Sequence, residues 1–193
     1  MSRLVRKPSR SWNFFKILKE LLANGVRKKS SNGTVVLFAK KEICVLKNYK
    51  IGFDVWALVL FLFVMIPNII WLAIPAPNDI LRVDSVTKTI DSIASVSQVL
   101  MIAILCIIKN SESKKLSVTP LIAGTVICCL LYYVSWFAYY QGIAGTIVIL
   151  ALTVLPCSAF LLYAIDRRNR IAIIPIAFFT ICHLIYAFAN FII

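Results

Sequence analysis

The chain has 193 residues, of which 61% are hydrophobic and only 15% are charged, against about 25% charged residues in soluble domains. This composition excludes an ordinary soluble globular protein and predicts a polytopic membrane protein. The net charge of +13 would also suit a nucleic-acid binder, but 13 of the 21 basic residues precede position 51 and the others flank apolar segments. We therefore assign the charge to membrane orientation and expect no nucleic-acid partner.

The first 50 residues form a basic segment with 13 Lys or Arg and only two Glu, which we expect to stay on the cytoplasmic side. Within it, Ser11 to Asn24 carries apolar residues at helical spacing and predicts an amphipathic helix. Such a helix would lie on the inner membrane surface and attract anionic lipids. The alternative is that the segment serves only as an orientation signal and lipid tether.

The first predicted span covers residues 51–74, which are almost wholly apolar. This length suffices for a helix to cross the roughly 30 Å hydrocarbon layer of a bilayer. Pro75 and Pro77 follow directly and predict the end of the helix. Asp54 lies about one turn inside the cytoplasmic end, where we expect it to be paired or to reach interfacial water rather than to carry protons.

Four further apolar segments predict spans at about residues 91–108, 119–140, 143–165 and 171–193. Residues 51–193 are thus expected to form one membrane domain, an all-α bundle of five transmembrane helices in the lipid bilayer. Lys and Arg in the short connections orient it with the N-terminus inside and the C-terminus outside. This arrangement puts 19 of the 21 basic residues on the cytoplasmic face of the plasma membrane.

Most polar residues of the spans fall in the predicted outer half. Because a polar group facing lipid is costly, we expect them to face the bundle interior or a water-filled cleft. In the second and fifth spans they recur every three or four positions, so each set shares one helix face. The residues predicted to converge on a ligand are Asn68, Trp71, Asp91, Ser95, Gln98, Tyr132, Trp136, His183, Tyr186 and Asn190.

Two interpretations of this polar set stay open. One is an outward-facing pocket with aromatic walls, and with Asp79 and Asp84 at its rim, for a small hydrophobic or cationic ligand. The other is ordinary membrane architecture. In that case Tyr and Trp anchor the helices at the interface, and the amides and hydroxyls form hydrogen bonds between helices.

The sequence offers no residues for catalysis or metal binding. His183 is the only histidine, which excludes a multi-histidine metal site, and the six cysteines include no C-x-x-C pair. Phosphate-binding glycine loops, H-E-x-x-H and serine-hydrolase motifs are also absent. We therefore expect no catalytic residue, no metal and no cofactor, and a protein that is not an enzyme.

One strip of the chain resembles a known group. FDVWALVLFLFVMIPNIIWLAIPAPNDILR, followed by VTKTIDSIASVSQVLMI, resembles small uncharacterised membrane proteins of Gram-positive bacteria over about residues 53–102. The resemblance implies a bacterial plasma membrane and no particular activity. In its five-span size the chain is also similar to the translocator protein family, which binds porphyrins and sterols. The Trp and Pro-Pro pattern of that family's first loop is missing here.

These features predict a non-enzymatic protein that acts by binding. Its ligand would be either a membrane-protein partner, including a second copy of the chain, or a small hydrophobic or cationic molecule in the outer cleft. The alternative is an oligomeric small-solute transporter or channel. If the protein binds a membrane partner, the small-residue pairs Ala123-Gly124 and Ala144-Gly145 should face outward from the bundle. If it is a transporter, substrate flux should depend on Gln98.

Overall fold

The computed structural model describes residues 48–77, 79–113 and 116–192. The predicted amphipathic helix at 11–24, and the rest of the basic segment up to residue 47, lie outside these residues. The chain divides into two compact units, residues 1–51 and 52–193. The described part of the first unit contains strand β1 (Tyr49–Ile51), and the second unit contains the membrane helices.

The second unit is built from five long helices. Each is long and apolar enough to cross a membrane, and together they confirm the predicted all-α five-helix bundle of a polytopic membrane protein. A single 3-10 turn, η1 (Ile80–Arg82), and a three-residue strand, β2 (Ile108–Asn110), lie in the connections. The five helices are α3 (Val55–Ala73), α4 (Lys88–Ile107), α5 (Pro120–Tyr140), α6 (Thr146–Asp166) and α7 (Arg170–Phe191).

The helix ends depart from the predicted spans by a few residues, for local reasons. Helix α6 begins at Thr146 rather than 143, because Gly142 has a φ of 85° and Gly145 is an extended N-cap. Helix α4 begins at Lys88 rather than 91, so its first turn is polar and lies outside the apolar stretch. Helix α3 stops at Ala73, two residues before Pro75, as the prolines predict.

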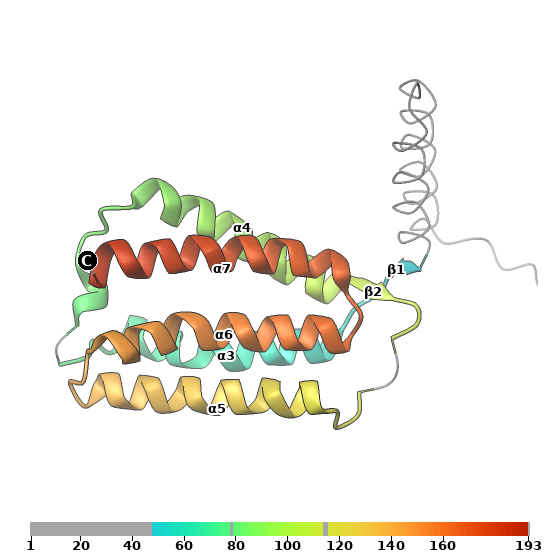
Figure 1. Ribbon diagram of the computed structural model, residues 1–193, viewed down its shortest axis with the longest axis horizontal. Coiled ribbons are helices and arrows are strands. Elements are labelled where there is room, and N and C mark those ends of the chain that lie inside the picture. The colour runs from blue at the N-terminus through green and yellow to red at the C-terminus, as the bar shows by residue number, and fades with distance from the viewer. Residues whose placement is uncertain (1–47, 78, 114–115, 193) are drawn as a thin grey trace, which may run out of the picture. The chain divides into compact units, whose positions relative to one another are not determined.

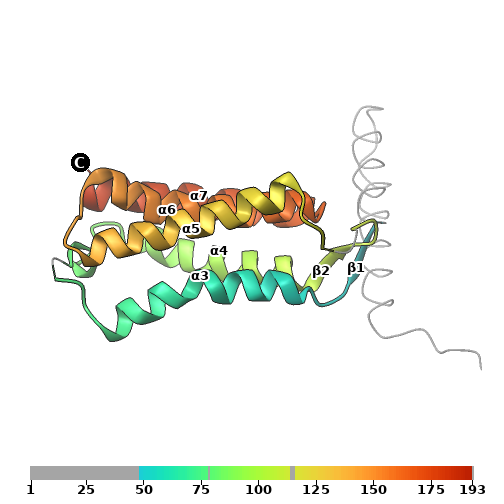
Figure 2. The same cartoon turned by 90° about the horizontal axis from the view of Figure 1, so that it is seen from below.

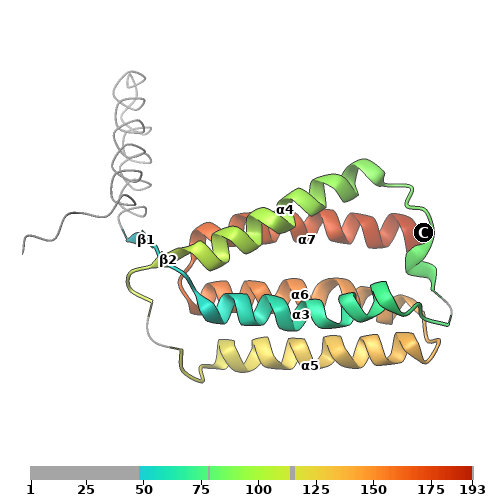
Figure 3. The same ribbon diagram turned by 180° about the vertical axis from the view of Figure 1, so that it is seen from behind.

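The helices form two layers. Helices α5, α6 and α7 pack closely side by side in chain order, and α4 packs along α7 (Figures 1 and 3). Figure 2 shows α3 and α4 on one side of the bundle and α5, α6 and α7 on the other. Helix α3 approaches α5 and α6 closely at only a few positions. Side chains and a cavity therefore separate α3 from the layer it covers.

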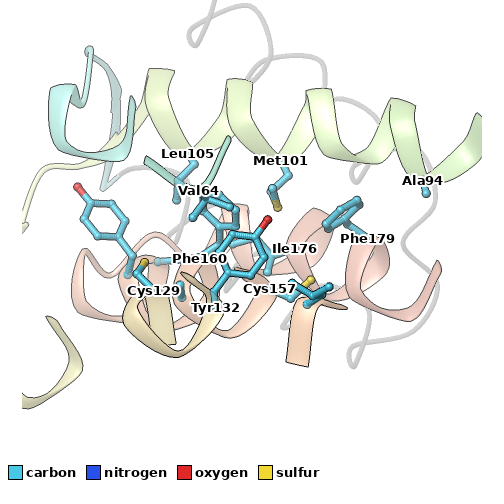
Figure 4. Close-up of a cluster of buried hydrophobic side chains, with 14 of the residues drawn as sticks. Val64, Ala94, Met101, Leu105, Cys129, Tyr132, Cys157, Phe160, Ile176 and Phe179 are labelled. Carbon is cyan, nitrogen blue, oxygen red and sulfur yellow. The ribbon is translucent and has the colours of Figure 1, made fainter. Parts of the chain in front are cut away.

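All five helices contribute to one buried core. Figure 4 shows Val64, Met101, Tyr132, Phe160 and Ile176, one from each helix, in the same cluster. Met101 and Ile176 have no exposed surface. The outward faces are apolar as well, with Val99 67% exposed, for example. Apolar side chains on both the inside and the outside of a bundle are typical of helices in contact with lipid.

The bundle has two ends, which we name after the carboxylate at each. At the Asp79 end, connections join α3 to α4 and α5 to α6. At the Asp54 end, connections join α4 to α5 and α6 to α7, and the backbone N–H of Asp54 donates to the carbonyl of Cys106 at 2.7 Å.

Candidate functional site

A cavity of about 290 Å³ lies between α3 and the other four helices. It extends from the middle of the bundle toward the Asp79 end, where Leu81 and Phe191 line it. Eight of its 18 lining residues are Phe, Tyr or Trp. The cavity therefore has the apolar, aromatic character of small-molecule sites.

The structure brings seven of the ten predicted ligand residues to this cavity. They come from α3, α4, α5 and α7. They are Asn68, Trp71, Gln98, Tyr132, Trp136, His183 and Tyr186. Whether they bind a ligand stays a prediction.

The other three predicted residues, Asp91, Ser95 and Asn190, do not line the cavity. Asn190 donates to the hydroxyl of Thr87 at 2.9 Å, and its side-chain oxygen accepts from the backbone of Val86 at 2.8 Å. Asp91 accepts from the same Thr87 hydroxyl at 3.0 Å, and the exposed Ser95 hydroxyl donates to the Asp91 carbonyl. The Asn190 amide thus holds the connection before α4 to α7, and the Asp91 carboxylate holds it to α4. This is the structural role that the sequence left open for these residues.

The site also contains residues that sequence reasoning missed. Helix α6 contributes Ile149, Leu152, Thr153, Pro156 and Phe160 to the lining. These side chains lie in a helix that is apolar on every side, so no periodic pattern marks the face that borders the cavity.

One polar group of the cavity wall joins α3 to α5. The side-chain amide of Asn68 donates to the Tyr132 hydroxyl at 2.7 Å and to the Val64 carbonyl at 3.0 Å. Next to it, the ring of Trp136 meets Tyr132 edge-on, with centroids 6.4 Å apart. The Trp136 indole N–H is buried and has no hydrogen-bond acceptor in the described part of the chain. A buried donor of this kind normally finds a water or a ligand atom.

A second polar group lies on α4 and α7. Gln98 borders the cavity from α4 and His183 borders it from α7. The His183 ring stacks with Phe179 at a centroid distance of 5.0 Å and with Tyr186 at 6.1 Å. None of the described lining residues is Asp, Glu, Lys or Arg. The described lining thus offers amides, three hydroxyls and an imidazole, and no fixed charge.

Asp79 forms a compact cluster where the cavity approaches the end of the bundle. Its carboxylate accepts from the Trp71 indole at 2.9 Å, the Tyr139 hydroxyl at 2.9 Å and the Arg82 Nε at 2.8 Å. The Arg82 guanidinium lies 4.9 Å from the Trp71 ring centroid and donates to the carbonyls of Trp71 and Leu72. Arg82 thus satisfies carbonyls that the end of α3 leaves without donors.

These contacts keep Asp79 ionised. Burial by itself raises the pKa of the Asp79 carboxyl, but hydrogen bonds from Trp71, Tyr139, Arg82 and the Ala76 backbone outweigh burial and lower the pKa below its usual 3.8. The carboxylate that the sequence places at the rim is therefore neutralised by a cation of the same chain. Asp84, the other predicted rim carboxylate, is exposed.

A buried ionic cluster lies at the other end, around Asp54. This carboxylate caps α3 by accepting from the backbone of Trp56 and Ala57 at 3.2 and 3.4 Å. It also accepts from the Tyr163 hydroxyl at 3.0 Å and lies 3.7 Å from the Nε of Arg167. The side chains of Asp54 and Arg167 are 6% and 9% exposed. The expected pairing of Asp54 is present, with an arginine of α6's C-terminal end as the partner.

Comparison of the chain with protein-family models, with curated proteins and with solved structures finds no match. The fold and the cavity define a polytopic membrane protein with a small-molecule-sized cavity between its candidate spans. The sequence resemblance over residues 53–102 stays an expectation.

Proposed function

We propose that this protein binds a small hydrophobic or amphiphilic molecule in the cavity between α3 and the other four helices, without chemical conversion. The observation that carries the proposal is the convergence of uncharged hydrogen-bonding side chains from four helices on one aromatic-lined volume of about 290 Å³.

The predicted small-residue pair on α5 is divided, because Ala123 is exposed, as a partner-binding seam requires, whereas Gly124 is half-buried. A Cβ added at Gly124 would lie 3.2 Å from the Leu162 side chain of α6, so this small residue serves the close approach of α5 and α6. A partner-binding seam would instead leave Gly124 facing lipid. Gly145 has open space around it, but it lies before α6 rather than within a span.

Transport is the second candidate, because α3 forms one wall of the cavity and hydrogen bonds to Tyr132 and Tyr133 join it to α5. The Asp79–Arg82 pair lies at one end of it and the Asp54–Arg167 pair at the other. For alternating access, the bundle would have to open at each of these two ends in turn. Flux in proteoliposomes that is lost when Gln98 is changed would favour this candidate.

Positive-inside counting supports an orientation with the Asp54 end in the cytoplasm and the Asp79 end outside the plasma membrane. The exposed Asp84 at the Asp79 end provides the test. A single added cysteine, Asp84→Cys, should react with a membrane-impermeant maleimide in intact cells. Labelling only after the cells are opened would reverse the orientation.

Ligand binding is tested by native mass spectrometry of the protein extracted gently from its host membrane. We expect a small-molecule adduct on the wild type and its loss in Gln98→Phe, which fills the cavity. Val99→Phe is the matched control, because Val99 is the next residue of α4, is 67% exposed and does not line the cavity. Absence of any adduct, or a stoichiometric protein partner that Gln98→Phe leaves bound, would contradict the proposal.

A further inference from the structure

We propose that the ligand is an uncharged, flat compound of about two fused rings that carries a hydrogen-bonding oxygen at each end. This inference rests on the proposed ligand-binding function and narrows the ligand class from hydrophobic or amphiphilic molecules to neutral ones. Three properties of the cavity support it: the charge of its lining, its size and rings, and the distribution of its polar groups.

The charge of the lining disfavours an ionic ligand. No described lining residue is acidic or basic. Of the nearby carboxylates, Asp79 is paired with Arg82, and Asp91, which accepts from the Thr87 hydroxyl, lies outside the lining. Aromatic faces attract cations, but moving an ion into an apolar site without a counter-charge costs far more than such contacts return. A neutral molecule avoids this cost.

The size and the rings of the cavity favour a small flat ligand. Its volume of about 290 Å³ lies at the lower end of the roughly 300–1,000 Å³ typical of ligand pockets. Aromatic side chains from α3, α5, α6 and α7 line it, and such side chains stack well against planar rings. Two fused rings fit this volume.

Two polar groups of the lining lie on different sides of the bundle, and a further lining hydroxyl, that of Thr153 on α6, donates to the Ile149 carbonyl. The hydrogen-bonded pair of Asn68 and Tyr132 joins α3 to α5, whereas Gln98 and His183 lie on α4 and α7. Figures 1 and 3 show α4 and α7 together on one side of α6 and α5 on its other side. Amide and imidazole groups both donate and accept hydrogen bonds. A ligand that spans the cavity therefore meets a polar partner at each end.

Four probes of similar size separate these properties in equilibrium binding to the full-length protein in lipid nanodiscs. Umbelliferone, kept neutral in mildly acidic buffer, has an oxygen at both ends, coumarin has oxygens at one end, and naphthalene has none. N-Methylquinolinium is a flat cation. We expect umbelliferone to bind about threefold to tenfold more tightly than coumarin, since one net hydrogen bond is worth that factor. Naphthalene should bind more weakly still, and the cation should not bind above empty nanodiscs.

The variant Gln98→Leu locates the effect in the cavity. It should weaken umbelliferone to the level of coumarin and leave naphthalene unchanged. Ser95→Ala, one turn away on α4 and outside the lining, should change neither. Binding of the cation that equals or exceeds the binding of umbelliferone would overturn the neutral-ligand inference. Equal binding of naphthalene and umbelliferone would overturn the inference that the ligand carries a hydrogen-bonding oxygen at each end. Both results leave ligand binding intact, whereas binding of no probe contradicts the proposed function itself.

Discussion

The hydroxyl of Tyr133 on α5 donates a 2.7 Å hydrogen bond to the backbone carbonyl of Phe63 on α3. Phe63 lies four residues before Pro67, and a proline has no N–H to donate to that carbonyl. The rings of Phe63 and Tyr133 also stack, with centroids 4.8 Å apart. Helix α5 thus supplies the hydrogen bond that α3 lacks at its proline, as membrane helices require.

Removing this hydroxyl should destabilise the bundle only while the proline is present. Tyr133→Phe keeps the stacked ring and is expected to lower the free energy of unfolding by about 1 kcal/mol. In a Pro67→Ala background the new backbone N–H bonds to the Phe63 carbonyl, so the same substitution should cost close to nothing. The measurement is a double-mutant cycle of unfolding free energies in mixed micelles.

Tyr140→Phe is the matched control for this cycle. Tyr140 donates to the carbonyl of Ile74, at the C-cap of α3 and away from the proline. Its loss should cost the same in both backgrounds. An equal cost of Tyr133→Phe with and without Pro67 would show that the hydroxyl does not compensate for the proline.

The Asp79 cluster predicts a loss of stability in acid. Because hydrogen bonds lower the pKa of Asp79 below 3.8 in the folded protein, the ionised carboxylate stabilises the fold above the unfolded-state pKa. That contribution disappears as the pH falls through the lower, folded-state pKa. We therefore expect the wild-type free energy of unfolding to decline below about pH 4.

Asp79→Asn isolates this effect from the other carboxylates. The variant should be less stable than the wild type at neutral pH, since Arg82 and the Tyr139 hydroxyl lose a charged acceptor. The difference between the two proteins should shrink as the pH drops below the usual carboxyl range. A difference that is independent of pH would mean that the charge of Asp79 contributes no stability.

The buried pair at the other end predicts strong coupling between Asp54 and Arg167. Arg167→Met leaves the 6%-exposed Asp54 carboxylate without its cation, which should cost about 3 kcal/mol. Adding Asp54→Asn removes the charge and keeps an N-cap side chain for α3, so the double variant should recover at least half of that loss. Additive costs in the double-mutant cycle would contradict a direct interaction.

The position of each polar residue along its helix was predictable from the sequence, whereas the helix face that borders the cavity was predictable only in part. Hydropathy locates the five spans, and the position of Gln98 or His183 within a span gives its depth. Periodicity groups Asp91 with Gln98 on one face, but seven residues of helix separate them by about 10 Å along the axis. Gln98 therefore reaches the cavity, while Asp91 lies beyond it beside Thr87.

The other features of the site depend on tertiary packing, which local sequence patterns do not predict. Thr153 and its neighbours on α6 line the cavity from a helix with no polar face, so nothing in the sequence marks them. The ion pair of Asp54 with Arg167 joins residues more than a hundred positions apart. The neutralisation of Asp79 by Arg82 likewise depends on the path of the connection after α3.

The most direct test of ligand binding is an experimental density map of the protein in nanodiscs formed from its own host membrane, without detergent exchange. The proposal predicts compact non-protein density among Gln98, Tyr132 and His183, within the volume of about 290 Å³. A cavity closed by its own side chains, or filled only by lipid acyl chains, would contradict it. The polar residues would then be ordinary contacts between helices.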